Sequence, residues 1–570
     1  MIFKTIKYSL ILFVISLFLQ SCSSSKSVEV KDPKFVFPSS QAYLHYTRGT
    51  IYSQNWMYQE AVEEYKKALE FDNDSLLLNE KLAEGYKQLG KQSEAIGTLK
   101  KAIHLKGNVA ISLALVQLQI EQDAYAEALE TCLKTIKESP ESADAYFYLG
   151  KIYLHSGKSV EAVEAYKKAQ ELDPKNELFC LNLGLVYSKE GDYKKAEEQY
   201  LGALRIAPEY TDSLYALALL YHLTGRYDEA LEYFKRIEIL MPNDSSVQIN
   251  IGIILNQQKK YEEAVKYLEK AAELDPENSE AYFRLSLAYF QLKEEKKAVE
   301  SITTAVKLNP SNRDILQAKG IMQLESKDRE GALAVFKKLI KQEPKNITGY
   351  LYVSYILSIS KDFNSAATVL ESGVANIPAD LDLRLYLGGA YTELKEYEKA
   401  EKAYMEVVRI DPKGEKGYYF LGVIRERLKK TEAAIKDFLK VVEINNKNAD
   451  AYNYIGYMWA DRNINLEKAL EYATKALELE PQNGAFLDSL GWVYYRLGKY
   501  DEALKYIEQA FNIFRENGSE DAVICEHLGD VYIKKKLFKN AKEMYERSLK
   551  IDPLNEDLKR KVKHIENNAL

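Results

Sequence analysis

Residues 143–176 read ADAYFYLGKIYLHSGKSVEAVEAYKKAQELDPKN, and this stretch of the chain decides the fold. Its first half places apolar or small residues at the spacing of one helical face, at Tyr146, Leu149, Gly150 and Tyr153. Its second half does the same at Ala162, Tyr166 and Ala169. Asp173-Pro174 closes the stretch, because proline cannot continue a helix and disfavours helical geometry in the residue before it. The stretch therefore predicts two amphipathic helices joined by a turn.

The same pattern recurs along the chain with a period of 34 residues. Nine of the 13 prolines keep this spacing: Pro140, Pro174, Pro208, Pro242, Pro276, Pro310, Pro344, Pro378 and Pro412. A second series at the same spacing consists of alanines: Ala128, Ala162, Ala196, Ala230, Ala264, Ala298, Ala332, Ala366, Ala400 and Ala434. A fixed period of this length predicts one helix-turn-helix unit stacked many times. Stacking buries the apolar stripes that a single unit leaves exposed.

The period divides most of the chain into consecutive repeats. Their ranges are 42–75, 76–108, 109–142, 143–176, 177–210, 211–244, 245–278, 279–312, 313–346, 347–380, 381–414, 415–448, 449–483, 484–521 and 522–555. One extra residue near Asn463 and four around Glu516–Gly518 are expected to lie in inter-helix loops. Residues 556–570 predict a final amphipathic helix, which would cap the open end of the stack.

This register of small, aromatic and proline positions resembles the tetratricopeptide repeat. The resemblance covers residues 42–555 and implies an all-α, right-handed superhelical solenoid of about 15 repeats. It also implies that the chain binds other proteins through the concave groove that the first helices of the repeats form.

The first 22 residues are of a different kind. Lys4 and Lys7 precede an apolar run from Tyr8 to Leu19, which predicts a secretory signal over residues 1–21. The run is shorter than the roughly 20 apolar residues that a membrane-spanning helix needs. The sequence Leu19-Gln20-Ser21-Cys22 resembles the lipobox of bacterial lipoproteins, which implies that Cys22 becomes the lipidated N-terminus. A plain signal peptide or an uncleaved anchor remains the alternative.

Residues 22–41 predict a flexible tether between the lipid and the repeats, because this stretch is rich in serine and marked by Pro33 and Pro38. Ser23, rather than aspartate, follows the cysteine. By the sorting rule of enterobacterial lipoproteins this implies the outer membrane, with the protein facing the periplasm.

Composition argues against nucleic acid as a partner. The net charge is −7, and the 78 basic and 85 acidic residues are interspersed along the chain, whereas a nucleic-acid surface would show a strong basic bias. We interpret the many neighbouring glutamates and lysines as a solvated convex face.

No motif in the chain predicts catalysis, a metal site or a cofactor. Cys132, Cys180 and Cys525 fall on core positions of distant repeats, so we expect them to be structural. The six histidines are scattered among distant repeats, and the chain has neither a nucleophile elbow nor a phosphate-binding glycine loop. The chain is therefore predicted not to be an enzyme.

Aromatic residues on the first helices are the candidates for partner binding. The candidates are Phe147, Tyr215, Phe283, Phe290, Tyr355, Tyr419, Tyr457, Trp492 and Tyr495. Exposed aromatic side chains are typical interface anchors. The alternative is that some of these rings only pack between neighbouring repeats. If they face the groove, replacing Trp492 and Tyr495 by alanine weakens partner binding and leaves the melting transition nearly unchanged.

The last repeats carry a more particular resemblance, in YMWADR (457–462), LDSLGWVYYRLG (487–498) and EHLGDVY (526–532). These stretches are similar to a bacterial group of long tetratricopeptide lipoproteins. That group includes an outer-membrane adaptor, which presents cell-wall hydrolases to a periplasmic carboxyl-terminal processing protease. The resemblance implies a lipid-anchored scaffold that gathers periplasmic proteins. A structural assembly factor of an envelope secretion or pilus-type complex remains an equally open interpretation.

Overall fold

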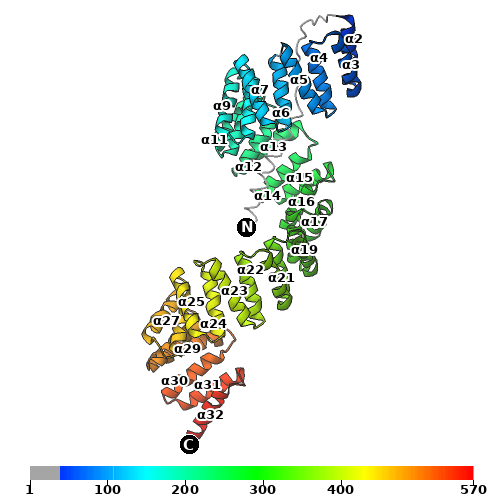
Figure 1. Cartoon of the computed structure of the whole chain (residues 1–570). Coiled ribbons are helices and arrows are strands. Elements are labelled where there is room, and N and C mark those ends of the chain that lie inside the picture. The colour runs from blue at the N-terminus through cyan, green and yellow to red at the C-terminus, as the bar shows by residue number, and fades with distance from the viewer. Residues whose placement is uncertain (1–38, 107, 569–570) are drawn as a thin grey trace. The chain divides into compact units, whose positions relative to one another are not determined.

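The computed structural model describes residues 39–106 and 108–568, and the predicted signal segment, Cys22 and most of the predicted tether lie outside this range. Every regular element of the described residues is an α-helix, and none of these residues forms a strand. Consecutive helices pack in antiparallel pairs, as Figure 1 shows. The prediction of an all-helical repeat fold is confirmed.

The chain divides after Ile254 into two compact units. The first unit holds the helices α2 (Ser40–Gln54), α3 (Tyr58–Phe71), α4 (Leu76–Gln88), α5 (Gln92–Lys106), α6 (Val109–Glu121), α7 (Tyr125–Glu138), α8 (Ala143–His155), α9 (Ser159–Leu172), α10 (Glu177–Lys189), α11 (Tyr193–Ile206), α12 (Thr211–Leu223) and α13 (Tyr227–Leu240). The division falls within α14 (Ser245–Gln257).

The second unit continues the same alternation of helices. It holds α15 (Tyr261–Leu274), α16 (Ser279–Gln291), α17 (Glu295–Leu308), α18 (Arg313–Glu325), α19 (Arg329–Gln342), α20 (Ile347–Ile359), α21 (Phe363–Asn376), α22 (Leu381–Glu393), α23 (Tyr397–Ile410), α24 (Glu415–Arg427), α25 (Thr431–Ile444), α26 (Ala449–Asp461), α27 (Leu466–Leu479), α28 (Gly484–Arg496), α29 (Tyr500–Glu516), α30 (Ala522–Lys534), α31 (Phe538–Ile551) and α32 (Glu556–Asn568). From residue 76 onward, each repeat range given above starts at the first residue of a helix.

Local sequence explains where the helices begin. The first helices of most repeats follow a serine, asparagine or aspartate whose side chain accepts a backbone hydrogen bond. Ser142 caps α8 by accepting from Ala145, and Asn176 caps α10 by accepting from Leu178. These caps satisfy N–H groups that the first helical turn leaves without an intrahelical partner.

The turn inside each repeat needs one residue in the left-handed region. Glycine fills it in some repeats, for example Gly157 with φ of 73°. Lysine fills it in six successive repeats: Lys259, Lys293, Lys327, Lys361, Lys395 and Lys429. The extra residue predicted near Asn463 also lies in such a turn, because Asn463 and Asn465 both have positive φ.

Close helix crossing places the core between the two helices of a repeat. Gly150 of α8 faces Tyr166 of α9, and a Cβ atom added to this glycine would lie 2.7 Å from the tyrosine ring. Gly184 and Tyr200 repeat the arrangement in the next pair, with a distance of 2.6 Å. Tyr166 and Tyr200 are fully buried, so the small and large positions of the repeat interlock.

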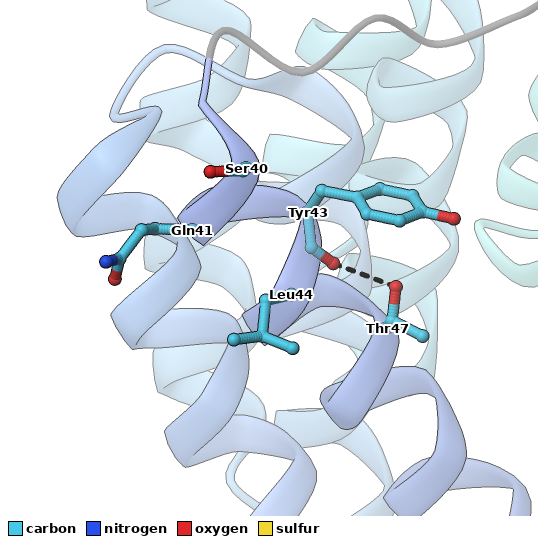
Figure 2. A pocket seen from close by; sticks show the side chains of 5 residues that line it. All are labelled: Ser40, Gln41, Tyr43, Leu44 and Thr47. Atoms are coloured by element: carbon cyan, nitrogen blue, oxygen red, sulfur yellow. Dashed lines mark hydrogen bonds between the residues drawn. The ribbon is translucent and has the colours of Figure 1, made fainter.

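Three boundaries differ from the prediction or refine it. The first helix begins at Ser40, within the range predicted as tether, because the Ser39 hydroxyl accepts a hydrogen bond from Ala42 N–H at 3.0 Å. Of the four extra residues around Glu516–Gly518, three lengthen α29, which has 17 residues where α31 has 14, and one lies in the loop that follows it. The predicted final helix is α32, and its Leu558 and Ile565 are buried. At the other end, the outer face of α2 leaves Tyr43 and Leu44 exposed (Figure 2).

Candidate partner-binding face

The aromatic candidates all lie on first helices, at the fifth, ninth or twelfth residue of the helix. Three of them are buried: Phe147, Phe283 and Trp492. Tyr355 is 53% exposed, and Tyr215, Phe290, Tyr419, Tyr457 and Tyr495 are half-buried. Phe147, Phe283 and Trp492 therefore follow the alternative interpretation, in which the ring packs within the stack.

The Phe147 ring packs against neighbouring helices, and the Phe283 ring lies beside a side chain of its own helix. The ring of Phe147 lies 5.3 Å from the ring of Phe179 on the next first helix and 5.8 Å from that of Tyr166. The guanidinium of Arg284, the next residue of the same helix α16, lies 5.2 Å from the centre of the Phe283 ring. Adjacent first helices pack closely enough for a large side chain at the fifth position to become part of the core.

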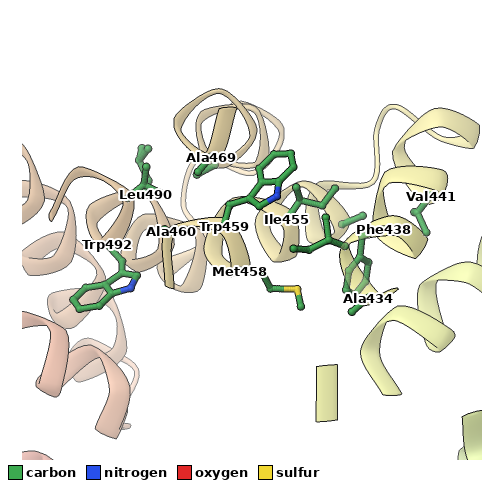
Figure 3. Packing of buried hydrophobic residues seen from close by; sticks show 14 residues of the cluster. Ala434, Phe438, Val441, Ile455, Met458, Trp459, Ala460, Ala469, Leu490 and Trp492 are labelled. Carbon is green, nitrogen blue, oxygen red and sulfur yellow. The ribbon is translucent and has the colours of Figure 1, made fainter. Parts of the chain in front are cut away.

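Two of the three C-terminal candidates stack beside a histidine. The Trp492 ring of α28 stacks on His527 of α30 at 4.0 Å between centroids, and Tyr495 stacks on Trp492 at 4.7 Å. Tyr457 of α26 approaches the same histidine at 6.2 Å. In Figure 3, Trp492 points away from Ala469 of the second helix α27. We call Tyr457, Trp492, Tyr495 and His527 the C-terminal ring cluster.

A buried carboxylate fixes the histidine of this cluster. Asp488 of α28 lies 3.0 Å and 3.1 Å from Nδ1 of His527 through its two carboxylate oxygens, and both residues are buried. Burial alone would lower the pKa of His527, but the Asp488 carboxylate outweighs it, so the pKa is raised above its usual value. The pair therefore favours an imidazolium held against an indole ring.

Two donors in and beside the ring cluster have no hydrogen-bond partner among the described residues. They are the indole Nε1 of Trp492 and the Nε of Arg496. The Arg496 guanidinium lies 5.8 Å from the centre of the Trp492 ring, and its NH2 group donates to the Asp461 carbonyl at 3.2 Å. Both donor atoms are buried, so they do not form part of the surface that is open to a partner.

Exposed aromatic residues form a second set on three successive first helices of the same unit. Tyr355 of α20 is 53% exposed, Tyr386 of α22 is 56% exposed and Phe420 of α24 is 38% exposed. We call these three residues the middle aromatic row. Sequence reasoning found Tyr355 and missed the other two, although each of those is the sixth residue of its helix, a position that aromatic residues occupy in several repeats.

Sequence reasoning also missed Asp488 and His527, which lie 39 residues apart in the chain. The signal that could have found them is their register. Asp488 is the fifth residue of its first helix and His527 the sixth residue of the next, so stacking brings them together.

The described residues hold no group of three or more histidine, cysteine or acidic side chains placed to bind a metal ion. Cys132, Cys180 and Cys525 are buried and unpaired, and burial raises the pKa of the Cys132 thiol to about 12. Along residues 39–106 and 108–568, no helix has both the length and the apolar character needed to cross a bilayer.

Known proteins resemble the chain at the level of the repeat. A TPR repeat-containing protein of Pseudomonas aeruginosa is 39% identical over 75 residues, a match that covers 13% of this chain and 12% of the relative. The structure of the APC/C hetero-tetramer Cut9-Hcn1 is 16% identical, with 82% of this chain and 98% of that chain covered and a TM-score of 0.38. The structure of YrrB, described as a TPR protein with an unusual peptide-binding site, is 27% identical, with 34% and 98% covered and a TM-score of 0.30.

Family models extend this similarity over both units. Models described as tetratricopeptide repeat match residues 42–75, 113–177, 177–238, 255–322, 357–421, 415–448 and 484–553. These matches together span more than half of the chain. The chain belongs to the tetratricopeptide-repeat family.

Proposed function

We propose that the chain is a non-enzymatic scaffold that is anchored to the outer membrane of a bacterium through lipidated Cys22 and binds periplasmic proteins through its first helices. The observation that carries the binding part is the middle aromatic row. Tyr355, Tyr386 and Phe420 expose large rings on three successive first helices, and exposed aromatic surface on a repeat protein marks an interaction site. Tetratricopeptide repeats generally bind protein partners, which supports the same conclusion.

The C-terminal ring cluster supports a second contact region. Tyr457 and Tyr495 are half-buried, so part of each ring is open to a partner. A partner segment that supplies apolar side chains would complement the exposed parts of these two rings. The resemblance of residues 449–555 to the adaptor group names a carboxyl-terminal processing protease and its substrates as the partners to examine first.

The test of binding replaces the middle aromatic row. Partners captured from envelope extracts by the wild-type chain are compared with those captured by the triple variant Tyr355→Ala, Tyr386→Ala and Phe420→Ala. Loss of one interface anchor costs about 2 kcal/mol, so we expect affinity for the partner to fall by roughly 30-fold or more. Trp492 is not used as a probe, because its ring is buried.

A matched control removes exposed apolar side chains from the second helices. Val160, Tyr193 and Phe538 are 70%, 39% and 48% exposed, and their replacement by alanine should leave capture unchanged. Equal capture by the row variant and the wild type would disprove binding through this face. Secretion or pilus subunits among the captured proteins, in place of a protease, would favour the assembly-factor interpretation.

Anchoring is tested separately through Cys22→Ser. The sequence Leu19-Gln20-Ser21-Cys22 supports lipidation, and the expected result is release of the variant from the membrane fraction. A variant that stays with membranes after a high-salt wash would overturn the lipoprotein part of the proposal and leave the binding part intact.

A further inference from the structure

We propose that the outer face of α2 and the turn that follows it dock on the lipid surface of the membrane that carries the chain. The proposal rests on the lipid anchor at Cys22 proposed above, and it concerns the end of the first unit that follows this anchor in the sequence. It starts from the register of the first helices.

In interior repeats, the third, seventh and tenth residues of the first helix pack against the preceding second helix. In α10 these residues are Phe179, Leu183 and Val186, which are at most 1% exposed. They belong to one apolar cluster with Tyr166 and Ala169 of α9. Coverage of these three positions is therefore a regular part of the fold.

The corresponding positions of the first repeat are uncovered. Gly49 is the crossing glycine of α2, because a Cβ atom added to it would lie 2.6 Å from the Tyr65 ring of α3. This register assigns the three positions to Leu44, Arg48 and Ile51. Leu44 is 45% exposed, Ile51 is 50% exposed, and Arg48 is exposed as well. We call this side of the helix the outer face of α2.

An open end of a repeat stack is expected to be polar. The C-terminal end follows this rule. The exposed residues of α32 are charged side chains and one histidine: Glu556, Asp557, Lys559, Arg560, Lys563, His564 and Glu566. At the N-terminal end, by contrast, Tyr43, Leu44 and Ile51 are large apolar residues that remain exposed. Tyr43 and Leu44 also line an open hollow of about 410 Å³, which Figure 2 shows.

The turn after α2 adds an exposed tryptophan. Trp56 is 80% exposed and has φ of 63°, a left-handed conformation that is strained for a bulky side chain. The other residues with positive φ in the described parts of the chain are glycine, lysine, aspartate or asparagine. Met57, the next residue, is 42% exposed, and the Tyr58 ring lies 6.3 Å from that of Trp56. A contact made outside the stack explains why a strained residue carries an exposed indole.

The side chains at this end have the chemistry of a bilayer interface. Tryptophan and tyrosine concentrate at the level of the lipid headgroups, because each ring has an apolar body and a polar N–H or O–H group. Trp56 and Tyr43 supply two such rings. Leu44 and Ile51 supply apolar side chains that can enter the boundary between headgroups and acyl chains. Exposed apolar surface of this composition marks a membrane interaction site.

The charges at this end do not repel an anionic lipid surface. α2 has no acidic residue, and Arg48 is exposed on its outer face. The acidic residues of the first repeat lie on α3 and in the loop after it. Among them, Glu64 contacts His45 of α2 at 2.7 Å and Lys67 at 2.8 Å. Residues 23–38 have three basic and two acidic residues: Lys26, Lys31, Lys34, Glu29 and Asp32.

The anchor favours lipid over a second copy of the chain as the occupant of this face. Residues 23–38 join Cys22 to Ser39, the residue that caps α2, and a chain of this length spans at most roughly 55 Å when fully extended. A surface that is held within this distance of α2 has a high effective concentration. A second copy would lose translational and rotational freedom on binding, which the tethered surface does not.

Tryptophan emission of the lipidated full chain tests the proposal. The chain is reconstituted into vesicles of phosphatidylethanolamine and phosphatidylglycerol, with acyl chains that are either plain or brominated just below the headgroup. Bromine quenches an indole that enters the bilayer, and Trp56 is the reporter because Trp459 and Trp492 are buried. We expect brominated lipid to reduce the Trp56 emission by about half or more, because an interfacial face lies about 5–10 Å deep. Trp56→Phe should remove this loss of emission.

A matched pair of variants assigns the contact to α2. Leu44→Ser with Ile51→Ser removes two exposed apolar side chains and adds no charge, so the fold is kept, and most of the quenching should be lost. The control Leu133→Ser with Val160→Ser removes side chains on α7 and α9 that are 45% and 70% exposed, and it should match the wild type. Equal quenching in the wild type and in the Leu44→Ser, Ile51→Ser variant would overturn the proposal.

Flotation of the same vesicles separates docking from anchoring. A wild-type chain that floats with the vesicles but shows no quenching of Trp56 would overturn docking and leave the anchor intact. Cover of α2 by a second copy would give this same result, together with a cross-linked dimer. A wild-type chain that does not float would overturn the anchor, and the docking proposal with it.

Discussion

Aromatic residues at the same register behave differently in this chain because their neighbours differ. Trp492 is the ninth residue of α28 and is buried against His527, the sixth residue of the next first helix. The ninth residue of α20 is Tyr355, which is 53% exposed. A histidine paired with Asp488 holds the indole in the first case. Burial at this position is therefore a property of the pair of residues and not of the aromatic residue itself.

Protonation of His527 gives a prediction for the effect of pH. The Asp488 carboxylate raises the pKa of His527 in the folded chain above the value of about 6.5 for an unfolded histidine. Stabilisation by the pair is therefore complete below about pH 6.5 and is lost as pH rises through the folded pKa. In a chain with Trp56→Phe and Trp459→Phe, the Trp492 emission should titrate with a midpoint above about pH 6.5, because the imidazolium quenches the stacked indole.

Two variants control this titration. The variant His527→Gln should abolish the transition in Trp492 emission. The melting temperature of this variant should no longer decrease as the pH is raised from about 6 to about 8. The variant Asp488→Asn should move the midpoint to lower pH, because the carboxylate that favours the imidazolium is gone. A midpoint that does not respond to Asp488→Asn would contradict the role given to this pair.

Pairs of helices are held together by the fit between one small and one large residue. Gly184 of α10 is the small residue that meets Tyr200 of α11, and a Cβ atom added there would lie 2.6 Å from the tyrosine ring. Gly97 of α5 is also within a helix, but a Cβ atom added there meets nothing within 4 Å. A side chain at Gly184 would therefore clash with the Tyr200 ring, whereas a side chain at Gly97 would meet no neighbour.

The two glycines predict opposite changes on replacement by alanine. Gly184→Ala should destabilise the first unit by about 1–3 kcal/mol, because the buried Tyr200 ring must move. Gly97→Ala should stabilise it by up to about 1 kcal/mol, because alanine is the better helix former and the site is exposed. Thermal unfolding followed by circular dichroism measures both shifts. Destabilisation of equal size in the two variants would mean that the close approach of Gly184 to Tyr200 does not control the effect.

At the scale of the whole molecule, stability is a sum of neighbouring contacts. α9 packs on α8 and α10, and this pattern of contact with adjacent helices continues in both units. In such a stack a local defect is expected to spread through the neighbouring repeats and to fade beyond them. The division of the chain into two compact units favours the same behaviour.

Truncation of one buried tyrosine tests this local character. Tyr166 is fully buried, so Tyr166→Ala should cost about 3–5 kcal/mol by analogy with other large aromatic truncations. Hydrogen exchange should rise in α8, α9 and α10 and stay unchanged in α28 to α31. Tyr166→Phe is the control, because the hydroxyl of Tyr166 has no hydrogen-bond partner among the described residues and its removal should change little. Faster exchange throughout both units would show that the chain unfolds as one cooperative body.

The amino-acid sequence by itself determined the repeat register and the positions of the helices. Proline after most second helices, capping residues before most first helices and small residues at the crossings act over a few residues, so a single repeat contains the information. The predicted ranges consequently start where the first helices start, from residue 76 to the final helix. The sequence did not predict the length of α29, because extra residues at that point can either form a loop or add a helical turn.

Tertiary structure alone decided which aromatic residues are available to a partner. Phe147 and Tyr355 are both aromatic residues of first helices, yet Phe147 is buried against Phe179 and Tyr355 is exposed. The exposure of each ring depends on a side chain in the next repeat, about 34 residues away, and on how closely the two first helices approach. The meeting of Asp488 with His527 has the same origin, because stacking joins positions that no local pattern connects. Helix formation in this chain depends on neighbouring residues in the sequence. Which side chains remain exposed on the surface depends on contacts between repeats.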